Sequence, residues 1–131
     1  MAGERSYRHT PIVPELRRLH SPDLLDMQSL EPETPDNFCI LVQAMIGPTG
    51  EQGEESFDFI VCTPKWLTES LSNHNYVLGR HHLIVARYDY NVIRDAVLFL
   101  CQTITGSTWK EVADHISRYG SWEFEDYIDS I

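Results

Sequence analysis

The side chains best suited to chemistry in this chain are its six histidines and its many carboxylates. A histidine can move a proton or hold a metal near neutral pH, and paired carboxylates can act as general acid and base. His81 and His82 are adjacent on an expected strand, so they point to opposite faces and cannot share a metal. The sequence has no Cys-x-x-Cys pair and no His-Glu-x-x-His helix. A zinc site therefore has no support, and we expect no cofactor.

The sequence also lacks the motifs of covalent catalysis and of phosphate binding. There is no Gly-x-Ser-x-Gly nucleophile turn, and no cysteine lies in a polar loop beside a histidine. The glycine-rich segment 47–53 lacks the Lys-Ser/Thr ending of a phosphate loop, and the glutamates at 51, 54 and 55 would repel phosphate. We therefore predict that the protein is not an enzyme. A small hydrolase that uses Asp58, a histidine and a further acid is kept as an alternative.

The carboxylates favour binding over catalysis. The last twelve residues, 120–131, contain four carboxylates, three aromatic side chains and no positive charge, in a chain of formal net charge −10. Aromatic anchors supply burial and carboxylates steer a basic partner. Such a chain would repel nucleic acid and acidic membrane surfaces, so we expect a basic protein as partner. The alternative is a solvated acidic end that Trp122 and Phe124 fix to the core.

Two acidic segments are candidates for the binding surface. If 122–126 is extended, Trp122 and Phe124 share one face and the glutamates between them share the other; if it is helical, Trp122 clusters with the aspartates instead. Trp122 and Phe124 are expected to be packed supports. The exposed candidates are Glu51, Glu54, Glu55 and Asp58 around an expected hairpin, and Glu123, Glu125, Asp126, Tyr127 and Asp129 at the C-terminus, with Tyr127 as an aromatic anchor.

Length and composition predict one globular domain. The chain has 131 residues, of which 42% are hydrophobic and 23% charged. We expect a flexible N-terminal arm over 1–13 and a single domain over 14–131. The longest apolar runs are too short to span a bilayer and no apolar segment follows the N-terminus, so a cytoplasmic location is expected.

Hydrophobic periodicity predicts an α+β fold: a small antiparallel-rich sheet of about four strands, backed by a short helix and two C-terminal helices. Strands are expected over 14–20, 38–46, 56–63 and 80–88. Helices are expected over 64–71, from 91 to 104 and from 108 to 119. Strand 80–88 is apolar on both faces, which favours a central or doubly covered position and also allows a homodimer through the sheet. In the short helix, Leu71 and either Trp66 or Leu67 should face inward.

The three cysteines, at 39, 62 and 101, all lie in apolar runs, which favours buried, reduced thiols. A hairpin that is symmetric about Gly50 and Glu51 places Cys39 opposite Cys62, although the register could slip by two residues. A disulfide between them is not expected in a reducing cytosol.

Several segments together resemble the immunity protein 8 family of bacterial polymorphic toxin systems, from about residue 14 to 127. The most specific are Ser-Phe-Asp-Phe at 56–59, Thr-Pro-Lys-Trp-Leu at 63–67 and Trp-Glu-Phe-Glu at 122–125. Pro-Glu-Leu-Arg-Arg-Leu-His at 14–20, Asn-Phe-Cys-Ile-Leu-Val-Gln at 37–43 and His-Leu-Ile-Val-Ala-Arg-Tyr at 82–88 also contribute. None of these segments is catalytic.

The resemblance implies an antitoxin: a small cytosolic α+β protein that binds the C-terminal toxin domain of a contact-dependent or secreted effector. Such toxins are often nucleases or other enzymes with basic substrate clefts. An acidic protein could occupy the cleft or block it from beside. The competing hypothesis is a non-catalytic adaptor domain that binds another basic protein.

Overall fold

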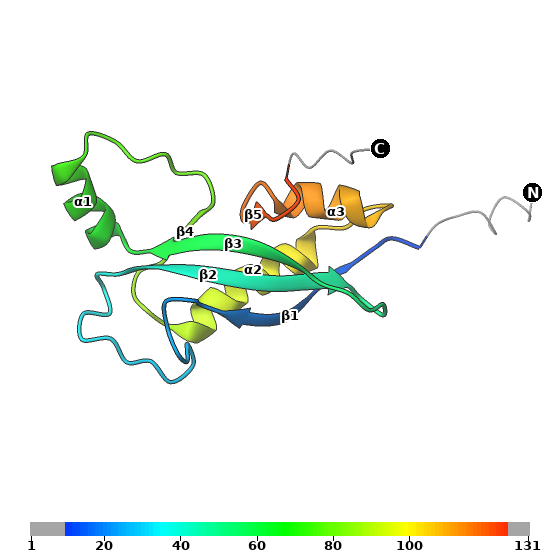
Figure 1. Ribbon diagram of the computed structural model, residues 1–131, viewed down its shortest axis with the longest axis horizontal. Helices are drawn as coiled ribbons and strands as arrows, with labels where there is room; N and C mark the ends of the chain where they lie inside the picture. The colour runs from blue at the N-terminus through cyan, green and yellow to red at the C-terminus, as the bar shows by residue number, and fades with distance from the viewer. Residues whose placement is uncertain (1–9, 126–131) are drawn as a thin grey trace, which may run out of the picture.

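Five strands and three helices follow one another along residues 10–125, the part of the chain that this computed structural model describes (Figure 1). In chain order they are β1 (Pro14–His20), β2 (Cys39–Pro48), β3 (Glu55–Cys62), α1 (Pro64–Asn73), β4 (His82–Ile84), α2 (Tyr90–Thr103), α3 (Trp109–Ile116) and β5 (Ser121–Trp122). The α+β class and the order of the first seven elements are as the sequence predicts.

The sheet is mixed, and β3 is its central strand. Strands β1, β2 and β3 form an antiparallel meander, and β2 and β3 share the longest register. Two short strands pair with different parts of the other edge of β3. Parallel β4 pairs with the end of β3, from Ile60 to Cys62, and antiparallel β5 pairs with Phe57 and Asp58. The C-terminal segment is thereby placed beside the β2–β3 hairpin.

The register of this hairpin confirms the predicted symmetry. Cys39 lies opposite Cys62, and the pairs continue without a shift to Ile46 opposite Glu55. Both cysteines are free thiols. The turn between the strands uses Gly50 and Gly53 at φ values of 82° and 101°, a region that glycine occupies without steric cost.

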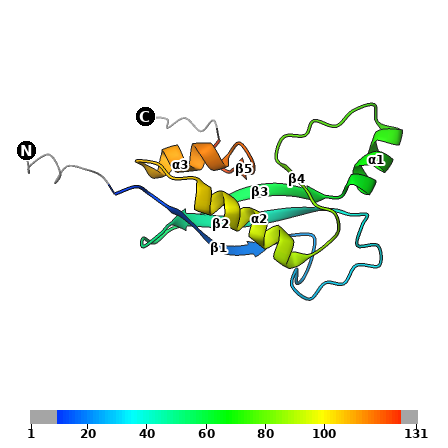
Figure 2. The ribbon, with the colours of Figure 1, turned by 180° about the vertical axis from the view of Figure 1, so that it is seen from behind.

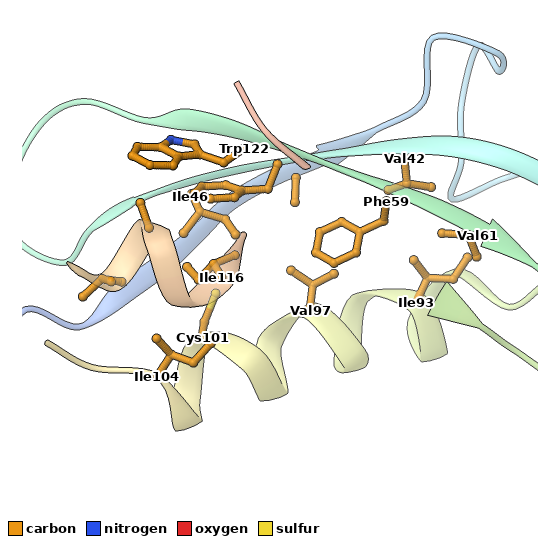
Figure 3. Close-up of a cluster of buried hydrophobic side chains, with 14 of the residues drawn as sticks. Val42, Ile46, Phe59, Val61, Ile93, Val97, Cys101, Ile104, Ile116 and Trp122 are labelled. Atoms are coloured by element: carbon orange, nitrogen blue, oxygen red, sulfur yellow. The ribbon is translucent and has the colours of Figure 1, made fainter. Parts of the chain in front are cut away.

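The core lies on one face of the sheet. Alternate residues of β2 and β3 point toward α2 and α3, and the sheet and these two helices meet around buried side chains (Figure 3). The amphipathic spacing of α2 places Ile93, Val97 and Cys101 against the sheet, and α3 adds Val112, Ala113 and Ile116. In both helices the buried residues lie on one face.

Side-chain caps begin all three helices. Thr63, Asp89 and Thr108 have extended backbones, and each accepts a hydrogen bond from an N–H group of the first turn. In α1, Pro64 follows the cap at a position where its missing N–H has no intrahelical partner. These local signals explain why the starts of the helices could be read from the sequence.

Two expectations about the middle of the chain were wrong. The strand expected over 80–88 shrinks to His82–Ile84, because His81 has a φ of 66° and Tyr88 leaves the sheet to donate to the carbonyl of Pro35. This short strand is at an edge, neither central nor doubly covered, and Ile84 is exposed. Helix α1 has no buried residue and Leu71 is exposed, since the helix projects beyond the end of the sheet (Figure 1).

The segment before β1 is hydrogen-bonded to the rest of the fold. Ile12 forms an isolated antiparallel bridge with Gly106, and the carbonyl of Val13 accepts hydrogen bonds from the N–H and hydroxyl of Thr49. Ile12 also packs against the core. The division into an arm over 1–13 and one domain over 14–131 stays a prediction.

Candidate functional site on the open face of the sheet

No helix among residues 10–125 lies over the centre of the second face of the sheet. Helix α2 passes behind the sheet in Figure 1 and in front of it in Figure 2, while α1 lies beyond one end. We call the uncovered side the open sheet face. From the alternation in each strand and the pairing register, its central residues are Arg18, His20, Leu41, Gln43, Met45, Ser56, Asp58, Ile60 and Ser121. All but the exposed Arg18 and His20 are half-buried.

A polar row crosses the middle of this face. His20 on β1 lies opposite Gln43 on β2, Gln43 lies opposite Asp58 on β3, and Asp58 lies opposite Ser121 on β5. The neighbouring rows contain the apolar side chains: Met45 lies between Arg18 and Ser56 in one, and Leu41 pairs with Ile60 in the other. A face that mixes partly buried apolar side chains with a few polar groups has the composition of a protein-binding surface.

The β3–β5 pairing brings the two predicted acidic segments together. The Ser56 N–H donates to Glu123 Oε1 at 3.1 Å, and the Glu123 N–H donates to the Ser56 carbonyl at 3.3 Å. Glu123 therefore lies beside the start of β3, on the same face as Asp58. Glu54 continues this face and accepts a 2.8 Å hydrogen bond from the Arg18 guanidinium. Glu54, Asp58 and Glu123 are separated by up to 69 residues in sequence, yet they share one surface.

Glu55 has a different position from the other candidates. It lies at the end of the core face, where its Oε1 accepts hydrogen bonds from the indole N–H groups of Trp109 at 2.7 Å and Trp122 at 2.9 Å. Trp122 also stacks on Phe57, with ring planes 11° apart. This carboxylate joins β3, α3 and β5, so its contacts are structural.

The remaining candidates lie at the margin or outside the described residues. The side chain of Glu51 is exposed at the hairpin turn, and Glu125 forms an ion pair with Arg80. Trp122 is buried, as expected, whereas Phe124 packs edge-on against it and stays 38% exposed. Asp126, Tyr127 and Asp129 lie outside residues 10–125.

The histidines of residues 10–125 do not belong to any group that could hold a metal ion. His81 precedes β4 instead of lying in it, and its Nε2 is 2.9 Å from the carbonyl oxygen of Ser117. The Nδ1 atom of His82 is 3.0 Å from the carbonyl oxygen of Arg80. Among residues 10–125, no three His, Cys, Asp or Glu side chains lie close enough together to hold a metal ion.

The thiols are protonated at neutral pH. Burial raises the pKa of Cys62 to about 11, with a smaller contribution from Cys39, and burial alone raises the pKa of Cys101 to about 11. For Cys39 the pKa is raised by burial and then by the charge of Asp23. A thiol acts as a nucleophile through its thiolate, so these cysteines are suited to packing.

An apolar pocket on the helix side has the wrong chemistry for catalysis. Its walls are Phe59, His82, Leu83, Ala96, Val97, Phe99, Leu100 and Tyr119. Only His82 and Tyr119 in this set carry polar side-chain atoms, and a catalytic pocket needs several that converge.

Within residues 10–125, no helix is long and apolar enough to cross a bilayer.

Comparison with known families gives the decisive match. The family model described as Immunity protein 8 covers residues 14–127. The chain belongs to the Immunity protein 8 family. No curated protein and no solved structure matches it significantly. Membership makes this an immunity protein of a toxin system, a class that is generally non-catalytic and has a cognate toxin as its partner.

Sequence reasoning about this Immunity protein 8 member found the acids but missed their neighbours. Gln43 and Ser121 were not selected, because neither carries a charge and their pairing with Asp58 depends on strand order. The alternation of Leu41, Gln43 and Met45 against Val42 and Ala44 was a usable signal. It separates two faces of a strand that reads as apolar throughout, but it does not say which face the helices cover.

Proposed function

We propose that this immunity protein neutralises its toxin by stoichiometric binding of a basic surface of the toxin domain to the open sheet face. The observation that carries the proposal is the gathering of Glu54, Asp58 and Glu123 on a face without a helix layer, through the pairing of β5 with β3. Carboxylates around partly buried apolar side chains fit a partner with basic and apolar groups. The charges speed encounter, and the apolar side chains that flank the polar row hold the complex.

The test uses the cognate toxin domain, in an inactivated form for binding and in the active form for rescue. Wild-type protein should form a one-to-one complex and rescue cells that express the toxin. The variant Glu54→Gln/Asp58→Asn/Glu123→Gln should associate about tenfold more slowly at low salt, with a weaker salt dependence. Glu123→Gln keeps an oxygen acceptor for the Ser56 N–H, so β5 should remain paired.

A matched control removes the same charge elsewhere. Glu33→Gln/Asp36→Asn/Asp95→Asn neutralises three exposed acids in the β1–β2 loop and on α2. This variant should associate at nearly the wild-type rate. Equal slowing of both variants would mean that net charge alone steers the toxin, and no change in either would move the interface away from the open sheet face. Failure of folded wild-type protein to rescue would remove the proposed function and favour an adaptor role.

A further inference from the structure

One carboxylate oxygen at the centre of the open sheet face has no hydrogen-bond partner among residues 10–125. Oδ1 of Asp58 is shielded from solvent, and no described residue donates a hydrogen bond to it. Asp58 lies in the polar row between Gln43 and Ser121, one strand on each side. No ion pair of the described residues includes it, whereas Glu54 and Glu125 each contact an arginine.

Such a group is unfavourable in the free protein. Withdrawing a carboxylate oxygen from water without giving it a donor has a large desolvation cost, and removal of the charge often restores stability. The position has no evident folding role, because neutral side chains such as Ser56 and Ile60 occupy the neighbouring places on this face of β3. Asp58 as a residue is only half-buried, so rotation of its carboxylate can present this oxygen at the surface. An acceptor that the fold leaves unsatisfied is then suited to a donor that arrives from outside.

We propose that Asp58 receives a cationic side chain of the toxin, an arginine or lysine that inserts at the middle of the open sheet face. This inference rests on the proposed function and adds the chemistry of its central contact. Leu41, Met45 and Ile60 surround the position and would exclude water from the ion pair once the partner is bound. Gln43 is the cross-strand partner of Asp58 and carries an amide oxygen, which gives the same cation a second acceptor.

The central position separates Asp58 from the acids at the rim. Exposed charges at the edge of an interface act mainly on the association rate, whereas a desolvated pair at the centre acts on the dissociation rate. Asp58 should therefore control how long the complex lasts. Glu54 and Glu123 should control how quickly it forms.

The test compares Asp58→Asn with Asp95→Asn, the same change at an exposed position of α2 on the other side of the molecule. Binding kinetics are measured with the inactivated cognate toxin domain, and thermal unfolding with each free protein. Asp58→Asn should dissociate about 30-fold faster or more, while its free form unfolds at the same or a higher temperature. Asp95→Asn should match wild type in both measurements. Asp58→Thr, a β-compatible residue without charge, should behave like Asp58→Asn.

The outcomes separate the two claims. A wild-type complex whose dissociation rate is unchanged by Asp58→Asn overturns this inference and leaves the proposed function standing. A lower unfolding temperature of free Asp58→Asn also overturns it, because the carboxylate would then be satisfied within the fold. Absence of any complex with folded wild-type protein counts against the proposed function itself. In a double-mutant cycle, substitution of one toxin arginine or lysine should weaken binding to the wild-type protein but not to Asp58→Asn.

Discussion

Oε1 of Glu55, the first residue of β3, accepts a hydrogen bond from the indole N–H of Trp122 on β5 at 2.9 Å. The same oxygen accepts from Trp109 on α3. Because β5 has only two residues, its ladder with β3 is too short to fix the C-terminal segment alone. The position of Glu123 on the open sheet face therefore depends on the carboxylate of Glu55, which points toward the core side of the sheet.

Replacing Glu55 should weaken the fold and displace β5. Glu55→Ala removes the acceptor and leaves two partly buried indole N–H groups without a partner, so the free energy of unfolding should fall by about 2–3 kcal/mol. Urea unfolding followed by tryptophan fluorescence measures this. Glu51→Ala at the exposed turn is the matched control, with an expected change of about 0.5 kcal/mol or less. Equal stability of the two variants would show that the Glu55 contacts do not hold β5.

Gly120 should not tolerate a side chain. A Cβ atom there would lie 2.6 Å from the Phe59 ring, a core residue that is 2% exposed. Gly120→Ala should cost about 1–3 kcal/mol, since the ring has to shift within a packed core. Gly79→Ala serves as control, because a Cβ atom at that position would meet nothing within 4 Å. It should be neutral or slightly stabilising in chemical denaturation. A stable Gly120→Ala would contradict this packing of Phe59.

The buried thiols should make stability fall in alkali. Burial raises the pKa of Cys101 to about 11 from an ordinary value of 9.0, so the folded state favours the protonated thiol. That contribution is complete below pH 9 and is lost as the pH rises toward 11, because the unfolded chain ionises first. Chemical denaturation across this range, with Cys101→Ala for comparison, measures the effect. A Cys101→Ala variant with the same alkaline slope as wild type would assign the loss to other groups.

Native cysteines should also alkylate slowly. At pH 8, a thiol of pKa about 11 is ionised in about one molecule in a thousand. Iodoacetamide should therefore label Cys62 and Cys101 much more slowly in the native protein than in urea. Labelling followed by mass spectrometry distinguishes the sites, and fast native labelling of Cys101 would contradict its burial.

The ion pair between Arg18 and Glu54 should reduce the negative charge that Glu54 presents to the toxin. Its 2.8 Å contact is at the edge of the open sheet face, where Arg18 is 64% exposed. Arg18→Gln leaves Glu54 unneutralised, so association with a basic toxin should speed up about two- to threefold at low salt. Glu54→Gln should slow it by a similar factor. Both effects should vanish near 0.5 M salt, where screening is strong. Slower association of Arg18→Gln together with faster association of Glu54→Gln would indicate that the toxin presents an acidic surface here.

Local signals explain what could be predicted about the fold. Proline and hydroxyl caps place the start of α1, the Thr108–Glu111 pattern places α3, and β-branched alternation with a glycine turn sets the hairpin register that pairs Cys39 with Cys62. These features depend on neighbours within a few residues, which the sequence displays directly. The extent of β4 could not be read this way, because its end depends on the contact between Tyr88 and Pro35.

The sequence by itself determined the acidic charge, the family and the identity of the candidate acids. Tertiary structure alone decided which of them lie on one surface. Strand alternation assigned Asp58 and Glu55 to opposite faces, and the pairing of β5 with β3 brought Glu123 beside Ser56 across 67 residues. Trp109 of α3 and Trp122 of β5 both contact Glu55 and Phe57 of β3, so this pairing involves residues far apart in the chain. The unsatisfied oxygen of Asp58 has the same origin, since only the assembled sheet removes it from water.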